Sequence, residues 1–93
     1  MVSPARFEIK ETKTDSGLNV SVTGELDMRT SDVLWQQIDK SLEGGITELT
    51  LDLRDLDFID STGLRLLITL HNRSQEEEWR LRLLSPKHEA ATL

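Results

Sequence analysis

The sequence predicts an α/β domain in which a mixed β-sheet carries helices packed on one face. Two alternating apolar runs flank a turn near the N-terminus, and two later segments carry apolar residues at helical spacing. A further alternating run follows each helical segment. The predicted order is β-β-α-β-α-β, followed by the beginning of a third helix. Strand–helix–strand alternation requires parallel pairing and right-handed crossovers in that part of the sheet.

The N-terminal third of the sequence predicts a β-hairpin. Residues 7–10 and residues 18–23 each alternate between apolar and polar side chains. Between them lies Asp15-Ser16-Gly17, whose residue types favour a turn. We expect Gly24 to end the second strand and to open the segment Gly24-Glu25-Leu26-Asp27.

The first helical segment is expected to begin at Thr30 or Ser31, because hydroxyl side chains accept hydrogen bonds from the free N–H groups of a first helical turn. Asp32 suits that turn. Gly44-Gly45 is the predicted end, since glycine is common just after a helix. One apolar stripe runs between these ends and consists of Leu34, Ile38 and Leu42.

The second half of the chain predicts strand, helix and strand. Residues 46–53 alternate, and a short apolar cluster follows at residues 56–59. Asp60-Ser61-Thr62 then begins a helix, with Asp60 or Ser61 as its N-cap. Residues 79–83 alternate again as a fourth strand. Ser85-Pro86 is expected to start another helix, because proline is favoured in a first turn.

The second helix carries two apolar stripes, although one is enough to hold a helix against a sheet. The first stripe consists of Leu64, Leu67, Ile68 and His71, and the second, nearly opposite, of Gly63, Leu66 and Leu70. The second stripe either packs against a neighbouring helix, such as one beginning near Pro86, or forms a partner-binding patch. The helical pattern leaves both interpretations open.

Ser61 lies where this second helix begins, and two roles fit that position. A helix N-terminus presents unpaired N–H groups and partial positive charge, so a phosphate on Ser61 would be well received. Nearby carboxylates would repel the added charge, so phosphorylation would change the surface sharply. The alternative role is that of a simple helix cap, because serine is among the preferred N-cap residues.

Two motifs closely resemble those of the STAS-domain anti-sigma factor antagonists, also called anti-anti-sigma factors. The segment at residues 53–64, Leu-Arg-Asp-Leu-Asp-Phe-Ile-Asp-Ser-Thr-Gly-Leu, resembles the family signature, and Thr23-Gly24-Glu25-Leu26-Asp27 resembles its second motif. The resemblance covers nearly the whole chain and implies a single STAS domain over residues 1–93. Family members usually continue past the fourth strand, whereas only residues 86–93 remain here. We therefore expect shortened C-terminal elements.

The resemblance implies a partner-switching role in bacterial transcription regulation. Unphosphorylated protein would bind an anti-sigma factor that is a serine kinase and thereby release a sigma factor. Phosphorylation of Ser61 would end binding, and a serine phosphatase would reset the switch. The expected phosphosite environment is Asp27, Asp60, Thr62 and Gly63, with Thr62 not excluded as a minor acceptor. The expected partner-binding residues are Glu25, Leu26, Leu64, Leu66 and Leu70. Self-association through the Leu66 and Leu70 stripe is a further hypothesis.

Charge and composition restrict the partners. Seventeen Asp and Glu stand against eleven Lys and Arg, for a formal charge of −6, and the arginines are dispersed. We therefore expect no direct binding to nucleic acid. No apolar run approaches the roughly 18 residues of a membrane span, so no membrane insertion is expected. Residues 1–6 lack a secretory signal, and the absence of cysteine fits a cytoplasmic location.

Catalysis is not expected. A nucleophilic serine needs an activating base, but His71 lies ten residues beyond Ser61 on the same helix, about 15 Å away. His71 and His88 alone make no metal site, and no phosphate-binding loop for nucleotides is present. We expect no cofactor and no metal. The alternative function is a non-catalytic STAS scaffold or accessory subunit of a stress-signalling or transporter assembly.

Overall fold

The computed structural model describes residues 7–85 and contains four strands and two helices in that range. The expected helix near Pro86 and the residue His88 lie outside it. The elements are β1 (Glu8–Lys13), β2 (Gly17–Leu26), α1 (Met28–Glu43), β3 (Glu48–Ile59), α2 (Ser61–Glu77) and β4 (Arg80–Leu84). This order confirms the predicted β-β-α-β-α-β sequence of elements.

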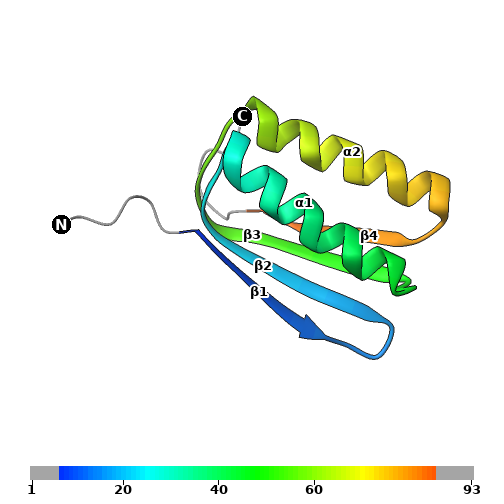
Figure 1. Ribbon diagram of the computed structural model, residues 1–93. Coiled ribbons are helices and arrows are strands. Elements are labelled where there is room, and N and C mark those ends of the chain that lie inside the picture. Colours follow the sequence, from blue (N-terminus) through cyan, green and yellow to red (C-terminus); the bar gives the residue numbers. More distant parts are fainter. Residues whose placement is uncertain (1–6, 86–93) are drawn as a thin grey trace.

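The four strands form one mixed sheet in the order β1-β2-β3-β4. β1 pairs antiparallel with β2 as the predicted hairpin, whereas β2, β3 and β4 run parallel. Both helices lie side by side on the same face of the sheet, as predicted (Figure 1). The parallel crossovers therefore bring both helix N-termini to the end of the sheet where β2 and β3 finish.

The core lies between this sheet face and the two helices. The central strands β2 and β3 alternate, so every second side chain points toward the helices. The fully buried side chains are Val20, Val22, Leu26, Leu34, Ile38, Leu49, Leu51 and Leu70. Burial of one such leucine contributes about 2 kcal/mol. The predicted stripe of α1 is confirmed, since Leu34 and Ile38 are buried and Leu42 packs against the core.

α2 packs on the core through its second stripe, for which the sequence left open either packing against a neighbouring helix or binding of a partner. Leu66 and Leu70 are 8% and 0% exposed, whereas Leu64 and Ile68 are 51% and 61% exposed. The buried stripe begins at Gly63, whose missing side chain allows the first turn of α2 to approach β2 closely. The stripe at Leu66 and Leu70 is therefore core, whereas Leu64 and Ile68 of the first stripe face outward and Leu67 packs partly against the core.

Two boundaries around β2 and α1 also differ from the sequence-based expectation. Gly24 does not end β2. It adopts a φ of +104° at an irregularity in the pairing with β3, and the strand continues to Leu26. The helix begins earlier than expected because Asp27, rather than Thr30 or Ser31, is its N-cap.

Candidate functional site

Two strand–helix junctions meet at one end of the sheet. Leu26 and Ile59 are register partners on the parallel strands β2 and β3, and each is followed by the aspartate that caps the next helix. The backbone N–H of Asp60 donates to the carbonyl oxygen of Leu26 at 3.1 Å, which ties the junctions together. We call residues 25–30 and 57–65 the junction surface. In Figure 1 both helices begin at this end.

Asp27 forms the first junction. One of its carboxylate oxygens accepts hydrogen bonds from the backbone N–H groups of Arg29 and Thr30 at 3.0 and 3.1 Å. The Thr30 hydroxyl in turn accepts from the Asp27 N–H at 2.8 Å and donates to the Glu25 carbonyl at 2.7 Å. The hydrogen bond from the Thr30 backbone is the main reason why the pKa of Asp27 lies below its ordinary value. This carboxylate is therefore held charged and fixed in place.

Asp60 is the N-cap of α2, which decides between Asp60 and Ser61 as the capping residue. The Asp60 carboxylate accepts from the N–H groups of Thr62 and Gly63 at 2.9 and 3.0 Å. Ser61 is the first helical residue, its side chain is exposed, and its hydroxyl makes no hydrogen bond within residues 7–85. The capping role thus belongs to the aspartate, and the serine hydroxyl stays accessible to another molecule.

Gly63 allows the two junctions to pack closely. A Cβ atom on this residue would lie 2.8 Å from the Leu26 carbonyl oxygen and 2.7 Å from Cγ1 of Ile59. Real Cβ contacts are almost never this short, so any larger residue would push α2 away from the sheet. Asp60, Thr62 and Gly63 belong to the first turn of α2 with Ser61 or adjoin it, and Asp27 caps the neighbouring helix.

The expected partner-binding residues divide into two groups. Leu26, Leu66 and Leu70 are core residues with at most 8% exposure, which is incompatible with direct contact to a partner. Glu25 is half-buried and Leu64 is exposed, so these two remain available. The same burial removes the surface stripe on which the self-association hypothesis depended.

Three exposed apolar side chains near Ser61 were not anticipated from the sequence. Met28, Phe58 and Ile68 are 71%, 52% and 61% exposed. Phe58 and Leu64 border a hollow of about 410 Å³ beside the end of β3, whose other lining residues are Leu53, Leu56, Asp57, Ile59, Leu67 and Ser85. Phe58 and Leu64 thus bring exposed apolar area together in one place, and contiguous apolar area is typical of a protein-binding surface. For Ile68 the available signal was the presence of two apolar stripes on α2, whereas the pattern around Met28 and Phe58 gave none.

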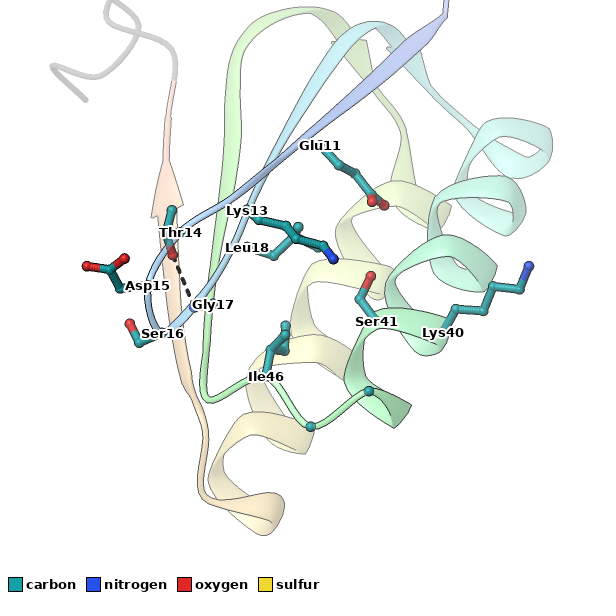
Figure 2. A pocket seen from close by; sticks show the side chains of 12 residues that line it. Glu11, Lys13, Thr14, Asp15, Ser16, Gly17, Leu18, Lys40, Ser41 and Ile46 are labelled. Atoms are coloured by element: carbon teal, nitrogen blue, oxygen red, sulfur yellow. Dashed lines mark hydrogen bonds between the residues drawn. The ribbon is translucent and has the colours of Figure 1, made fainter.

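A separate hollow of about 510 Å³ lies at the opposite end of the sheet. It is bordered by the β1–β2 turn and the C-terminal end of α1, with Lys13, Thr14 and Ser41 among its lining residues. Figure 2 shows the Lys13 ammonium group pointing toward Ser41, while Lys40 and Asp15 point outward. No expected site residue lines this hollow, so it plays no part in the junction surface.

The one histidine within residues 7–85 lies far from Ser61. His71 is exposed, and its place ten residues along α2 puts it about 15 Å from Ser61. Over residues 7–85, no three potential metal-binding side chains gather. Neither of the two helices described is long and apolar enough to cross a bilayer. The arrangement presents an exposed hydroxyl at Ser61 beside capping carboxylates and exposed apolar side chains.

Comparison with known proteins gives one matching family model, described as Mlab, STAS domain, over residues 9–93. The structure is similar to a crystal structure of an anti-sigma factor antagonist from Mycobacterium paratuberculosis, with 26% identity and a TM-score of 0.79, over 91% of this chain and 72% of that one. It also resembles the anti-sigma factor antagonist SpoIIAA in its unphosphorylated form, with 22% identity and a TM-score of 0.71, over 88% and 71%. A third similar structure is Mglu, with 20% identity and a TM-score of 0.75, over 85% of this chain but 20% of that one.

Proposed function

The chain belongs to the STAS-domain family, and on that premise we propose that it is an anti-sigma factor antagonist whose partner binding is switched off by phosphorylation of Ser61. In the unphosphorylated state it binds a kinase-type anti-sigma factor and releases a sigma factor for transcription. A serine phosphatase restores the binding state. The exchange takes place in the cytoplasm, and ATP belongs to the kinase rather than to this non-catalytic chain.

The observation that carries the proposal is that Asp60 caps α2 while the side chain of Ser61 is exposed. The Asp60 carboxylate accepts from the N–H groups of Thr62 and Gly63, so the exposed Ser61 hydroxyl is not the group that caps α2. A kinase can therefore modify this hydroxyl without unfolding the helix. The similarity to an anti-sigma factor antagonist over 91% of the chain supports the same role, and the related SpoIIAA structure is described as an unphosphorylated form.

Electrostatics and desolvation explain how phosphorylation would end binding. A phosphoserine adds about −1.5 to −2 charges at neutral pH. Asp27 and Asp60 already place negative charge on the junction surface. A phosphate on Ser61 adds to that charge, so a partner that fits the unmodified surface no longer matches its charge. A loss of about 3 kcal/mol on burying that phosphate against a closely fitting partner weakens binding on the order of a hundredfold.

The proposed interface is the accessible part of the junction surface with the outward face of α2. Leu64, Phe58 and Ile68 supply apolar area, and Glu25 supplies charge beside the cap of α1. Leu64 lies three residues after Ser61 on the helix, so a partner that covers the hydroxyl also reaches this leucine. Leu26, Leu66 and Leu70 support this surface from the core.

A phosphorylation assay with intact-mass detection tests the proposal. Wild type, Ser61→Ala and the matched control Thr62→Ala are each incubated with ATP and kinase-type anti-sigma factors of the same organism. We expect one added phosphate on wild type and Thr62→Ala and none on Ser61→Ala. Folded wild-type protein that none of these kinases modifies would contradict the proposal.

The second candidate is a non-catalytic scaffold or accessory role in a larger assembly, such as a stress-signalling complex or a transporter. The similarity to Mglu favours it, because there the same fold makes up about a fifth of a longer chain. In this case Ser61 would remain unmodified and the junction surface would bind its partner constitutively. The assay separates the two candidates, since a scaffold forms its complex without gaining phosphate mass.

A further inference from the structure

Arg65 lies four residues after Ser61 on α2, so the two side chains occupy the same face of the helix one turn apart. Four residues correspond to a rise of about 6 Å. Helical side chains lean toward the N-terminus, which directs the long Arg65 side chain back over the first turn, where Ser61 lies. An arginine placed four residues before the serine would instead lean away from it.

Arg65 has no carboxylate partner within the described part of the chain. Arg54, Arg73 and Arg80 each form an ion pair with a carboxylate between residues 7 and 85, and Arg65 forms none. Its side chain is exposed and borders a groove of about 260 Å³ between α1 and α2, next to Met28 and Thr62. Asp32 lines the same groove but forms no ion pair with Arg65 within residues 7–85, so the guanidinium is available to a new anionic partner.

The first turn of α2 has too few free N–H donors to bind a phosphate on Ser61 by itself. The N–H groups of Thr62 and Gly63 already donate to the Asp60 carboxylate, so two of the first-turn donors are occupied. The charges on the elements around Ser61 are mostly negative: Glu25 from β2, Asp27 and Asp32 from α1, Asp57 from β3 and Asp60 from the junction. The cations are Arg29 on α1 and Arg65 on α2. Arg29 already interacts electrostatically with Asp27 and contributes to the lowered pKa of that carboxyl.

We propose that Arg65 is the phosphate-binding residue of the modified protein and forms an ion pair with phosphoserine 61 along α2. This inference rests on the proposed function, because it concerns the phosphorylated state of the same residue. Formation of the pair draws the guanidinium away from the α1–α2 groove and toward the first turn of α2. Phosphorylation therefore adds negative charge at Ser61 and also removes a positive charge from the groove beside Met28.

The test installs phosphoserine at position 61 by genetic code expansion, so no kinase is needed. The second ionisation of the phosphate is followed by ³¹P NMR during a pH titration of the full chain. A nearby guanidinium favours the dianion, so the pKa of the phosphate should be lower with Arg65 than in Arg65→Gln. We expect a difference of about 0.3 unit at low ionic strength, as for an exposed pair one turn apart. High salt should shrink the difference.

Two other arginines serve as controls. Arg82→Gln, at an exposed position on β4 without an ion pair in the described structure, should leave the phosphate pKa unchanged. Arg29→Gln tests the rival cation on α1. An Arg65→Gln titration that overlays that of wild type, or a shift seen only in Arg29→Gln, would overturn the proposal. Because the phosphate is installed during translation, this outcome is independent of whether any kinase modifies Ser61.

Discussion

The carbonyl oxygen of Leu26 accepts a hydrogen bond from the backbone N–H of Asp60 at 3.1 Å. This bond joins the end of β2 to the start of α2, two segments separated by a helix and a strand in the sequence. It fixes the N-terminus of α2 beside that of α1, with the capping carboxylates Asp27 and Asp60 on neighbouring junctions. The position of Ser61 therefore depends on the parallel pairing of β2 with β3.

Alanine substitution of Asp60 and of Ser61 should change the free energy of unfolding by different amounts. Asp60→Ala removes the N-cap and should lower the free energy of unfolding by about 1 kcal/mol. Ser61→Ala should change it by less than about 0.5 kcal/mol, because the exposed hydroxyl bonds to nothing in the described structure. Urea unfolding measures both values. A Ser61→Ala cost equal to that of Asp60→Ala would restore the capping role to the serine.

Gly63→Ala should disturb the junction. The added methyl group would lie within 3 Å of the Leu26 carbonyl oxygen and of Ile59, so α2 must shift, at a cost of about 1 to 3 kcal/mol. Gly44→Ala is the control, because Gly44 ends α1 with a helical φ of −75° and its nearest atom would be 3.2 Å away. Urea unfolding should show the larger loss for Gly63→Ala. Equal losses would show that close approach at Gly63 is unimportant.

The burial of Leu70 and the exposure of Ile68 predict opposite behaviour for two residues of one helix. Leu70→Ala should cost about 2 to 5 kcal/mol of unfolding free energy, since it leaves a cavity in the core. Ile68→Ala removes an exposed side chain and should cost less than about 1 kcal/mol. Thermal or urea unfolding of the two variants distinguishes the faces. A reversed order would mean that α2 packs through its other stripe.

The lowered pKa of Asp27 predicts that the stability of the protein depends on pH. This pKa is lowered in the folded protein, so the unfolded chain takes up a proton first as the pH falls. The stabilisation is fully present above the ordinary pKa of about 4 and is lost as the pH falls through the lower folded value. Asp27→Asn keeps a capping acceptor but lacks the charge. The gap between the urea midpoints of wild type and this variant should therefore narrow below about pH 4, and a constant gap would contradict the assignment.

The arrangement of strands and helices could be predicted because alternation and turn residues are local properties of the sequence. The hairpin around Asp15-Ser16-Gly17 and the end of α1 at Gly44-Gly45 illustrate this. The start of α1 was predicted too late, since Thr30 supports the cap of Asp27 through its side chain rather than capping the helix itself. A residue that assists a cap and a residue that forms one have the same chemistry, so sequence position alone did not separate them.

The face of α2 could not be predicted because the stripe with more apolar residues, which includes Leu64 and Ile68, is the more exposed one. The buried stripe contains Gly63 and Ser74, which add no apolar area but permit close packing against the sheet. Only the three-dimensional register shows that Gly63 lies against Leu26. For the site, the motif predicts Ser61 as the phosphorylated residue, and the structure adds that Asp60 occupies the capping role.

The central proposal, that phosphorylation of Ser61 ends partner binding, is tested most directly by calorimetric titration. The kinase-type anti-sigma factor that modifies the protein, or in its absence each one encoded in the same organism, is titrated with unmodified protein and with protein carrying phosphoserine at position 61. We predict tight binding of the unmodified form and dissociation constants about a hundredfold higher for the phosphorylated form. Equal affinities for the two forms would contradict the proposal.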